Sequence, residues 1–82
     1  MHLVQLIYAS DVVANITEKD VQQIIATSRQ NNIASGVSGV LFYNRKYFFQ
    51  CLEGGREQVN ALYSRILKDT RHTNCRLLSF RE

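Results

Sequence analysis

Apolar side chains gather in three short stretches of this chain that polar or glycine-containing segments separate. Residues 3–9, 37–43 and 47–53 are rich in β-branched and aromatic side chains, which favour β-strands over helices. Only Asn-Arg-Lys at 44–46 separates the second stretch from the third, a spacing typical of a tight turn. The pattern therefore predicts one strand near the N-terminus and a β-hairpin in the middle of the chain.

Between the first strand and the hairpin, apolar side chains recur at helical spacing. Thr17 can cap a helix at its N-terminus, and Asp20 stands at the third helical position, as in a capping box. The stripe that follows consists of Val21, Ile24, Ile25 and Ser28. We expect this helix to end near Asn32, ahead of Gly36, because glycine favours a helix C-terminus.

A second helical stripe follows Gly54 and Gly55 and is expected to end near Asp69. It consists of Val59, Leu62, Tyr63 and Ile66. Residues 75–80 supply a final strand. The order βαββαβ is typical of an α+β sandwich in which both helices cover one face of the sheet, and we expect that sheet to be mixed.

Length and composition narrow the possible functions. The 82 residues form a single small domain, 1–82, with room for one core. No apolar run approaches the roughly 18 residues that a membrane-spanning helix needs. The first ten residues lack the basic, apolar and small-residue regions of a signal peptide. We therefore expect a cytoplasmic protein without a membrane span.

The charge and the reactive side chains argue against further classes of function. The net charge of +3 comes from scattered residues, so binding to nucleic acid is weakly favoured at most. Cys51 and Cys75 are far apart and lack a nearby histidine pair, which argues against a zinc site or a redox motif. We expect both thiols to be buried. No nucleophile, base and orienting group share a recognisable spacing, so we expect no enzyme.

Three polar side chains fall on positions that the pattern assigns to the interior: Tyr8, Gln50 and Asn32. Strand alternation groups Val4, Leu6, Tyr8 and Ser10 on the first strand, and Phe48, Gln50 and Leu52 on the third. Asn32 continues the apolar stripe of the first helix. A buried amide without a partner costs about 1–3 kcal/mol. These groups therefore form a satisfied core network, lie on an exposed sheet face, or bind a ligand with a polar edge and an apolar body.

The opposite side of the sheet is also apolar. It carries Leu3, Ile7, Tyr47, Phe49 and Cys51. An uncovered apolar patch usually marks a missing element or a partner. We expect a homo-oligomer or a protein partner to use this face.

Five motifs together resemble the BLUF family, the flavin-dependent sensors of blue light. They are LIYAS at 6–10, SRQNN at 28–32, GVSGVLFY at 36–43, FFQCLEG at 48–54 and LKDTRH at 67–72. Each motif is weak alone, but five in the family's order and spacing are specific. The resemblance implies a ferredoxin-like fold that binds FAD, or alternatively FMN or riboflavin, with the ring between the two helices.

The resemblance also implies roles for particular residues. Asn32 would contact the C4 carbonyl and N3 edge of the ring, with Asn31 close by. The slot would be lined by Ile24, Ile25, Ser28 and Ile66. The family's DxRH run, near the mouth of the pocket, corresponds to Asp69, Arg71 and His72. Tyr8 and Gln50 match the photoactive pair.

In the mechanism that the resemblance implies, Tyr8 gives an electron and a proton to the excited flavin, and Gln50 ends rotated or tautomerised. A glutamine suits this role because its amide both donates and accepts hydrogen bonds. The flavin ends chemically unchanged but absorbs at longer wavelength. Family members continue into a fifth strand, so the resemblance implies that this sequence is truncated at its C-terminus.

An RNA-recognition module is the alternative, since it shares the βαββαβ order and also uses aromatic side chains on its sheet. The cluster at 47–49 would then stack on bases. The glycine-bearing consensus of the third strand is not matched in RKYFFQCL, and the basic residues do not gather on one face. The sequence therefore favours the flavin sensor.

Overall fold

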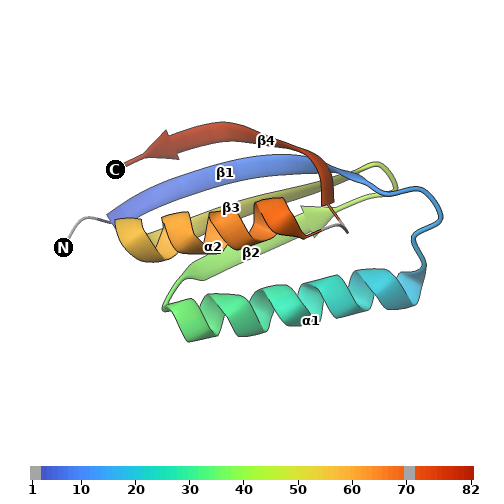
Figure 1. The fold of residues 1–82 in the computed structure, drawn as a ribbon, viewed down its shortest axis with the longest axis horizontal. Coiled ribbons are helices and arrows are strands. Elements are labelled where there is room, and N and C mark those ends of the chain that lie inside the picture. Colours follow the sequence, from blue (N-terminus) through green and yellow to red (C-terminus); the bar gives the residue numbers. More distant parts are fainter. Residues whose placement is uncertain (1–2, 70–71) are drawn as a thin grey trace.

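A computed structural model describes residues 3–69 and 72–82. Its elements, in chain order, are β1 (Leu3–Val12), α1 (Glu18–Ser35), β2 (Ser38–Tyr43), β3 (Tyr47–Gly55), α2 (Arg56–Lys68) and β4 (His72–Arg81). This succession, visible in Figure 1, confirms the predicted α+β class and the order βαββαβ. Within those residues, neither helix is both long enough and apolar enough to cross a membrane.

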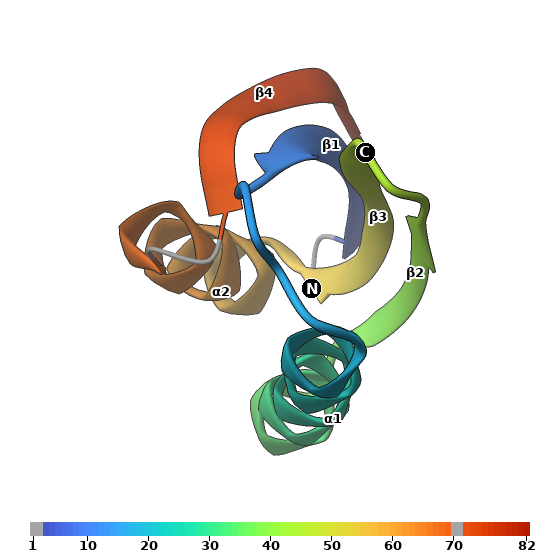
Figure 2. The ribbon, with the colours of Figure 1, turned by 90° about the vertical axis from the view of Figure 1, so that its right-hand side faces the viewer.

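The four strands form one sheet in the order β2-β3-β1-β4, and every neighbouring pair is antiparallel. The expectation of a mixed sheet was therefore wrong for the part of the chain described. Each helix carries the chain back along the sheet, so β1 and β2 run in the same direction, but β3 lies between them. Figure 2 shows both helices on the same side of a strongly curved sheet.

Helix α1 begins as predicted and ends later than predicted. Thr17 Oγ1 accepts a hydrogen bond from the Asp20 backbone N–H at 3.1 Å, and Asp20 Oδ2 accepts one from the Thr17 N–H at 3.0 Å. This confirms the capping box. The helix continues past Asn32 to Ser35, and Gly36 ends it in the left-handed region with φ 67°. The stop is therefore set by the glycine, which adopts this conformation without steric cost.

The main hydrophobic cluster lies between α2 and the sheet. It consists of Val4, Leu6, Tyr8, Val37, Leu52, Val59 and Leu62, with Tyr63 and Ile66 packed against it. The predicted alternation of β1 and the predicted stripe of α2 are thus confirmed. Val21 and Ile24 of α1 are buried but stand outside this cluster. Helix α1 therefore meets the rest of the domain across a separate region, which is where the pocket described below lies.

The side of the sheet away from the helices, here called the outer face, is apolar across three strands. The strand register aligns Val40 with Cys51 and Ile7 in one row, and Phe42 with Phe49 and Ala9 in the next. Phe42 and Phe49 are 60% and 39% exposed, and their ring centroids are 6.3 Å apart. Cys51 is only partly buried because it lies on this face, and Cys75 is partly buried as well, so the expectation that both thiols are buried was wrong.

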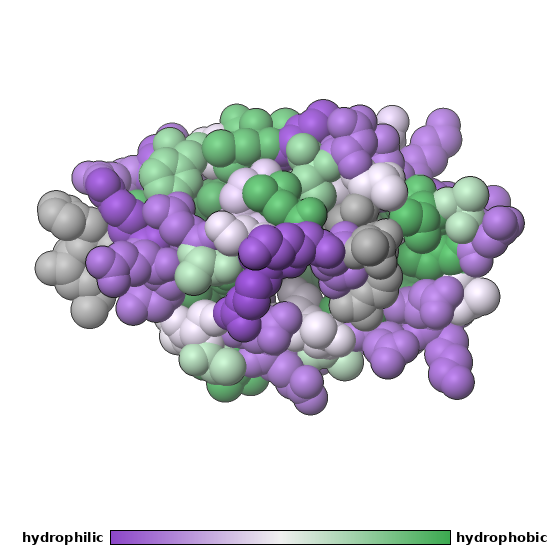
Figure 3. All heavy atoms as spheres, viewed as in Figure 1, coloured by the Kyte–Doolittle hydropathy of each residue, from purple (hydrophilic) through white to green (hydrophobic). Residues whose placement is uncertain are grey.

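Apolar side chains are also exposed along β4. Leu77, Leu78 and Phe80 all expose large apolar surface. Figure 3 shows apolar atoms gathered along the upper edge of the molecule, over this strand. A β-bulge between Ile7 and Tyr8 shifts the register of β1 against β4 at this point.

Candidate functional site

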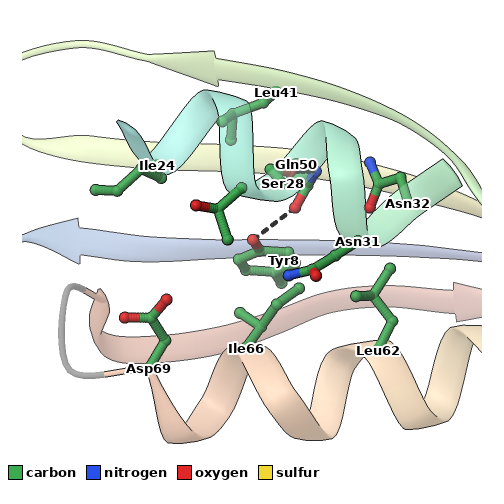
Figure 4. A pocket seen from close by; sticks show the side chains of 11 residues that line it. Tyr8, Ile24, Ser28, Asn31, Asn32, Leu41, Gln50, Leu62, Ile66 and Asp69 are labelled. Atoms are coloured by element: carbon green, nitrogen blue, oxygen red, sulfur yellow. Dashed lines mark hydrogen bonds between the residues drawn. The ribbon is translucent and has the colours of Figure 1, made fainter. Parts of the chain in front are cut away.

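A pocket lies between α1, α2 and the sheet, and Figure 4 shows the side chains around it. It encloses about 370 Å³ of empty space, part of which is open to solvent. Its walls are formed by Tyr8, Ile24, Thr27, Ser28, Asn31, Asn32, Leu41, Gln50, Leu62, Ile66 and Asp69.

Tyr8 and Gln50 meet on the helix-facing side of the sheet. The register of β1 and β3 places them directly opposite each other, so their side chains share one face. Both side chains are almost fully buried, at 1% and 2% exposure. The Tyr8 hydroxyl donates a hydrogen bond to Gln50 Oε1 at 2.7 Å, drawn as the dashed line in Figure 4. The predicted meeting of a phenol and an amide in the interior is confirmed.

Gln50 also connects the sheet to α1. Its Nε2 atom donates a hydrogen bond to Ser28 Oγ at 2.9 Å. A chain of two hydrogen bonds therefore runs from β1 through β3 to α1, and both ends of the Gln50 amide are used. Because a hydroxyl can donate as well as accept, Ser28 can bond to either end of that amide.

Burial is the main reason why the pKa of Tyr8 is raised above its ordinary value, and Cys75, Tyr63 and Asp69 add smaller electrostatic contributions in the same direction. The Tyr63 ring lies beside it, with ring centroids 5.5 Å apart and planes inclined by 48°. The Tyr8 phenol is therefore held neutral, so its hydroxyl keeps the proton that it donates to Gln50.

Asn32 supplies a polar group that the protein itself does not use. It is 8% exposed, and in residues 3–69 and 72–82 its side-chain amide has no hydrogen-bonding partner. Its backbone carbonyl is occupied, because it accepts from the Val37 N–H at 2.9 Å. No fully enclosed side-chain N or O atom of the described residues lacks a partner, so the Asn32 amide reaches the open space of the pocket, where a bound molecule can pair with it. A free amide beside apolar walls fits a planar heterocycle with an imide edge, such as a flavin ring.

The structure brings together eight of the eleven predicted site residues. Those that line the pocket are Tyr8, Ile24, Ser28, Asn31, Asn32, Gln50, Ile66 and Asp69. Ile25 does not line it; this side chain borders a neighbouring hollow between α1 and β2. Arg71 lies outside the described residues. His72 begins β4, but its side chain is not described.

Sequence reasoning missed three side chains of the pocket wall and one glycine. Thr27 lies three positions after Ile24 and four before Asn31, so helical spacing could have identified it. Leu41 stands opposite Gln50 in the register of β2 and β3, and Leu62 was predicted only as a core residue. Gly39 matters through the side chain that it lacks, because a Cβ there would lie 2.5 Å from Asn32 Nδ2.

Comparisons with known proteins agree on one family. A model of the BLUF family, described as sensors of blue-light using FAD, matches residues 3–82. The blue light- and temperature-regulated antirepressor BluF of Escherichia coli K12 is 38% identical over 72 residues, which are 88% of this chain and 18% of that relative. The ground-state structure of BlsA superposes with a TM-score of 0.91 at 37% identity, covering 99% of this chain and 55% of that one.

Another similar structure contains a flavin. Klebsiella pneumoniae BlrP1, solved with FMN and cyclic diGMP, superposes with a TM-score of 0.85 at 33% identity, covering 96% of this chain and 21% of that one. The comparisons confirm the ferredoxin-like fold and the flavin sensor, and they give the RNA-recognition alternative no support.

Proposed function

The chain belongs to the BLUF family, the blue-light sensors that use a flavin, and we propose that Tyr8 and Gln50 are its photoactive pair. The observation that carries this proposal is the 2.7 Å hydrogen bond from the Tyr8 hydroxyl to Gln50 Oε1, buried in the wall of the pocket between the two helices and the sheet. Members of the family bind FAD or FMN. The domain itself works as a sensor, and any catalysis would come from a partner or another segment.

The lining of the pocket suits a flavin ring in its mixture of apolar and polar side chains. Ile24, Leu62 and Ile66 give it apolar walls from two helices, between which a planar ring can lie. Asn32 offers the ring an amide that is free to pair with its imide edge. Asn31 of α1 and Asp69 at the end of α2 also line the pocket, and Ile25 borders the adjacent hollow. Arg71 and His72 complete the proposed set by their match to the family motif.

The bound flavin would supply absorption of blue light and an acceptor for one electron. Tyr8 would be the electron donor of the pair, and its hydroxyl holds the proton that would move along the 2.7 Å bond to Gln50 Oε1. Once both are restored to Tyr8, Gln50 would remain rotated or tautomerised. Ser28 accepts from Nε2 before this change and can donate to Oε1 after a rotation, so both orientations are bonded. The signal is then a rearranged set of hydrogen bonds.

Substitution of Gln50 tests this assignment. Gln50→Leu keeps the volume and the apolar walls but removes both hydrogen bonds of the amide. The variant should still bind flavin and should lose the light-induced red shift of the flavin absorption. The matched control is Gln58→Leu, the same change at an exposed site on α2. A normal photocycle in Gln50→Leu would refute the role of Gln50 as the switch.

We also propose that the outer face is a protein interface, used by a second copy of the chain or by a partner. Two aligned apolar rows across β2, β3 and β1 support this, because such patches seldom stay exposed in a monomer. Hiding the patch contributes roughly 25 cal/mol per Å² of apolar surface. Gln50 lies between Phe49 and Cys51 on β3, so a change on the helix side is one residue away from this face.

The oligomeric state tests the interface. Phe49→Glu should lower the mass measured by light scattering, because it places a charge in the centre of the patch. Gln5→Glu adds the same charge to a polar position on the same face and should leave the mass unchanged. A wild-type chain that stays monomeric at high concentration, with no effect of Phe49→Glu, would contradict the proposal of self-association.

A further inference from the structure

Gly39 differs from the other glycines of this chain because a Cβ there would meet two side chains of the pocket, Asn32 and Gln50. A Cβ at this position would lie 2.5 Å from Asn32 Nδ2, 3.0 Å from Leu52 Cδ2 and 3.3 Å from Gln50 Nε2. Its backbone has no positive φ, so any residue could adopt the conformation. Gly36 is the opposite case, since it has a φ of +67° and open space around it. Position 39 is therefore restricted by the space that side chains leave, chiefly by the end of the Asn32 side chain, and not by backbone conformation.

Packing against Gly39 sets the position of the Asn32 side-chain amide, which α1 carries. Gly39 pairs with the buried Leu52 in the register of β2 and β3, so the missing side chain would point toward the helices. The main hydrophobic cluster contains no side chain of α1 within the described ranges. Among the residues that the structure describes, none makes a hydrogen bond to the Asn32 amide to hold it there. Its position thus depends on direct packing against the backbone of β2.

We propose that Gly39 is a positioning residue for the flavin site. Gly39 leaves room for the Asn32 amide, which would hold the flavin ring, beside the Gln50 amide, which would switch. It thereby sets the distance between these two amides. A methyl group at position 39 would push Asn32 away from β2 and toward the pocket. The functional part of this inference rests on the proposed function, whereas the packing part does not.

A double-mutant cycle tests the packing part on the flavin-free protein. Gly39→Ala should destabilise the wild-type chain more than an Asn32→Ala chain, because the nearest of the three atoms that it meets is then absent, while those of Leu52 and Gln50 remain. We expect the two effects on the unfolding equilibrium constant to differ by at least about twofold, the lower limit for residues in direct contact. The control is Gly54→Ala, whose Cβ would meet Val37 and the backbone of Gly36 but no pocket side chain. Its effect should be the same in both backgrounds.

Flavin titration and the dark absorption spectrum test the functional part. Gly39→Ala should raise the flavin Kd about tenfold and shift the flavin absorption band, whereas Gly54→Ala should change neither. Equal destabilisation by Gly39→Ala in both backgrounds would overturn the proposal, and so would a wild-type Kd and spectrum in that variant. If Gly39→Ala alone does not fold, the Gly39→Ala/Asn32→Ala chain should fold, and its failure to fold would also overturn the proposal. If wild-type protein binds no flavin, the proposed function fails, while the cycle still decides the role of Gly39.

Discussion

Replacing Tyr8 with phenylalanine removes one oxygen atom from the centre of the proposed mechanism. The ring stays, so no cavity large enough for a side chain forms, but Gln50 Oε1 loses its donor at 2.7 Å. Gln50 is 2% exposed, so water reaches its amide only through the pocket that it lines. A buried acceptor that loses its donor costs about 1–3 kcal/mol. We therefore expect Tyr8→Phe to lower the free energy of unfolding by about that amount, although phenylalanine is the more apolar residue.

Urea unfolding of the flavin-free protein measures this loss. In a domain of this size, each kcal/mol also corresponds to about 4–8 °C in Tm. The control is Tyr63→Phe, because in the described part of the chain the Tyr63 hydroxyl makes no hydrogen bond and its ring packs against Tyr8. Tyr8→Phe/Gln50→Leu should recover most of the loss, since neither partner is then left polar. If Tyr8→Phe costs no more than Tyr63→Phe, the hydrogen bond does not contribute as argued.

Two other predictions concern the ligand and pH. Asn32→Ala removes the free amide and should weaken flavin binding by about 0.5–1.5 kcal/mol, or roughly 2- to 13-fold in the Kd, as measured by titration; an unchanged Kd would exclude contact between Asn32 and the ring. Burial raises the pKa of Tyr8 in the folded state, so its contribution to stability is complete below the ordinary value of about 10 and is lost as pH rises above it. The free energy of unfolding should therefore fall more steeply with alkaline pH in wild type than in Tyr8→Phe, and parallel curves would contradict the assigned burial.

The parts of the fold that follow from local pattern were predictable. Alternation with a period of two placed Tyr8 and Gln50 on one sheet face, and the spacing of Thr17 and Asp20 marked the start of α1. The end of α1 was predicted too early because the apolar stripe stops at Asn32, whereas the backbone continues in a helix until Gly36. Local pattern thus locates an element better than it locates its ends.

Features that depend on pairing between distant strands were not predictable in this way. The antiparallel sheet results from the insertion of β3 between β1 and β2, which no local pattern records. Strand β4 begins at His72 because β1 extends to Val12 and pairs with it, although residues 72–74 carry no apolar signal. Gly39 belongs to the site only through the approach of α1 to β2. The strand order, the start of β4 and the place of Gly39 in the site are all decided by three-dimensional packing.

The most direct test of the account is the absorption spectrum of the flavin-loaded protein before, during and after blue light. The buried Tyr8–Gln50 hydrogen bond beside the free Asn32 amide predicts a yellow protein whose flavin absorption shifts reversibly to longer wavelength without reduction of the flavin. A protein that binds no flavin, or one whose flavin is bleached by light without a red shift, would contradict the central claim.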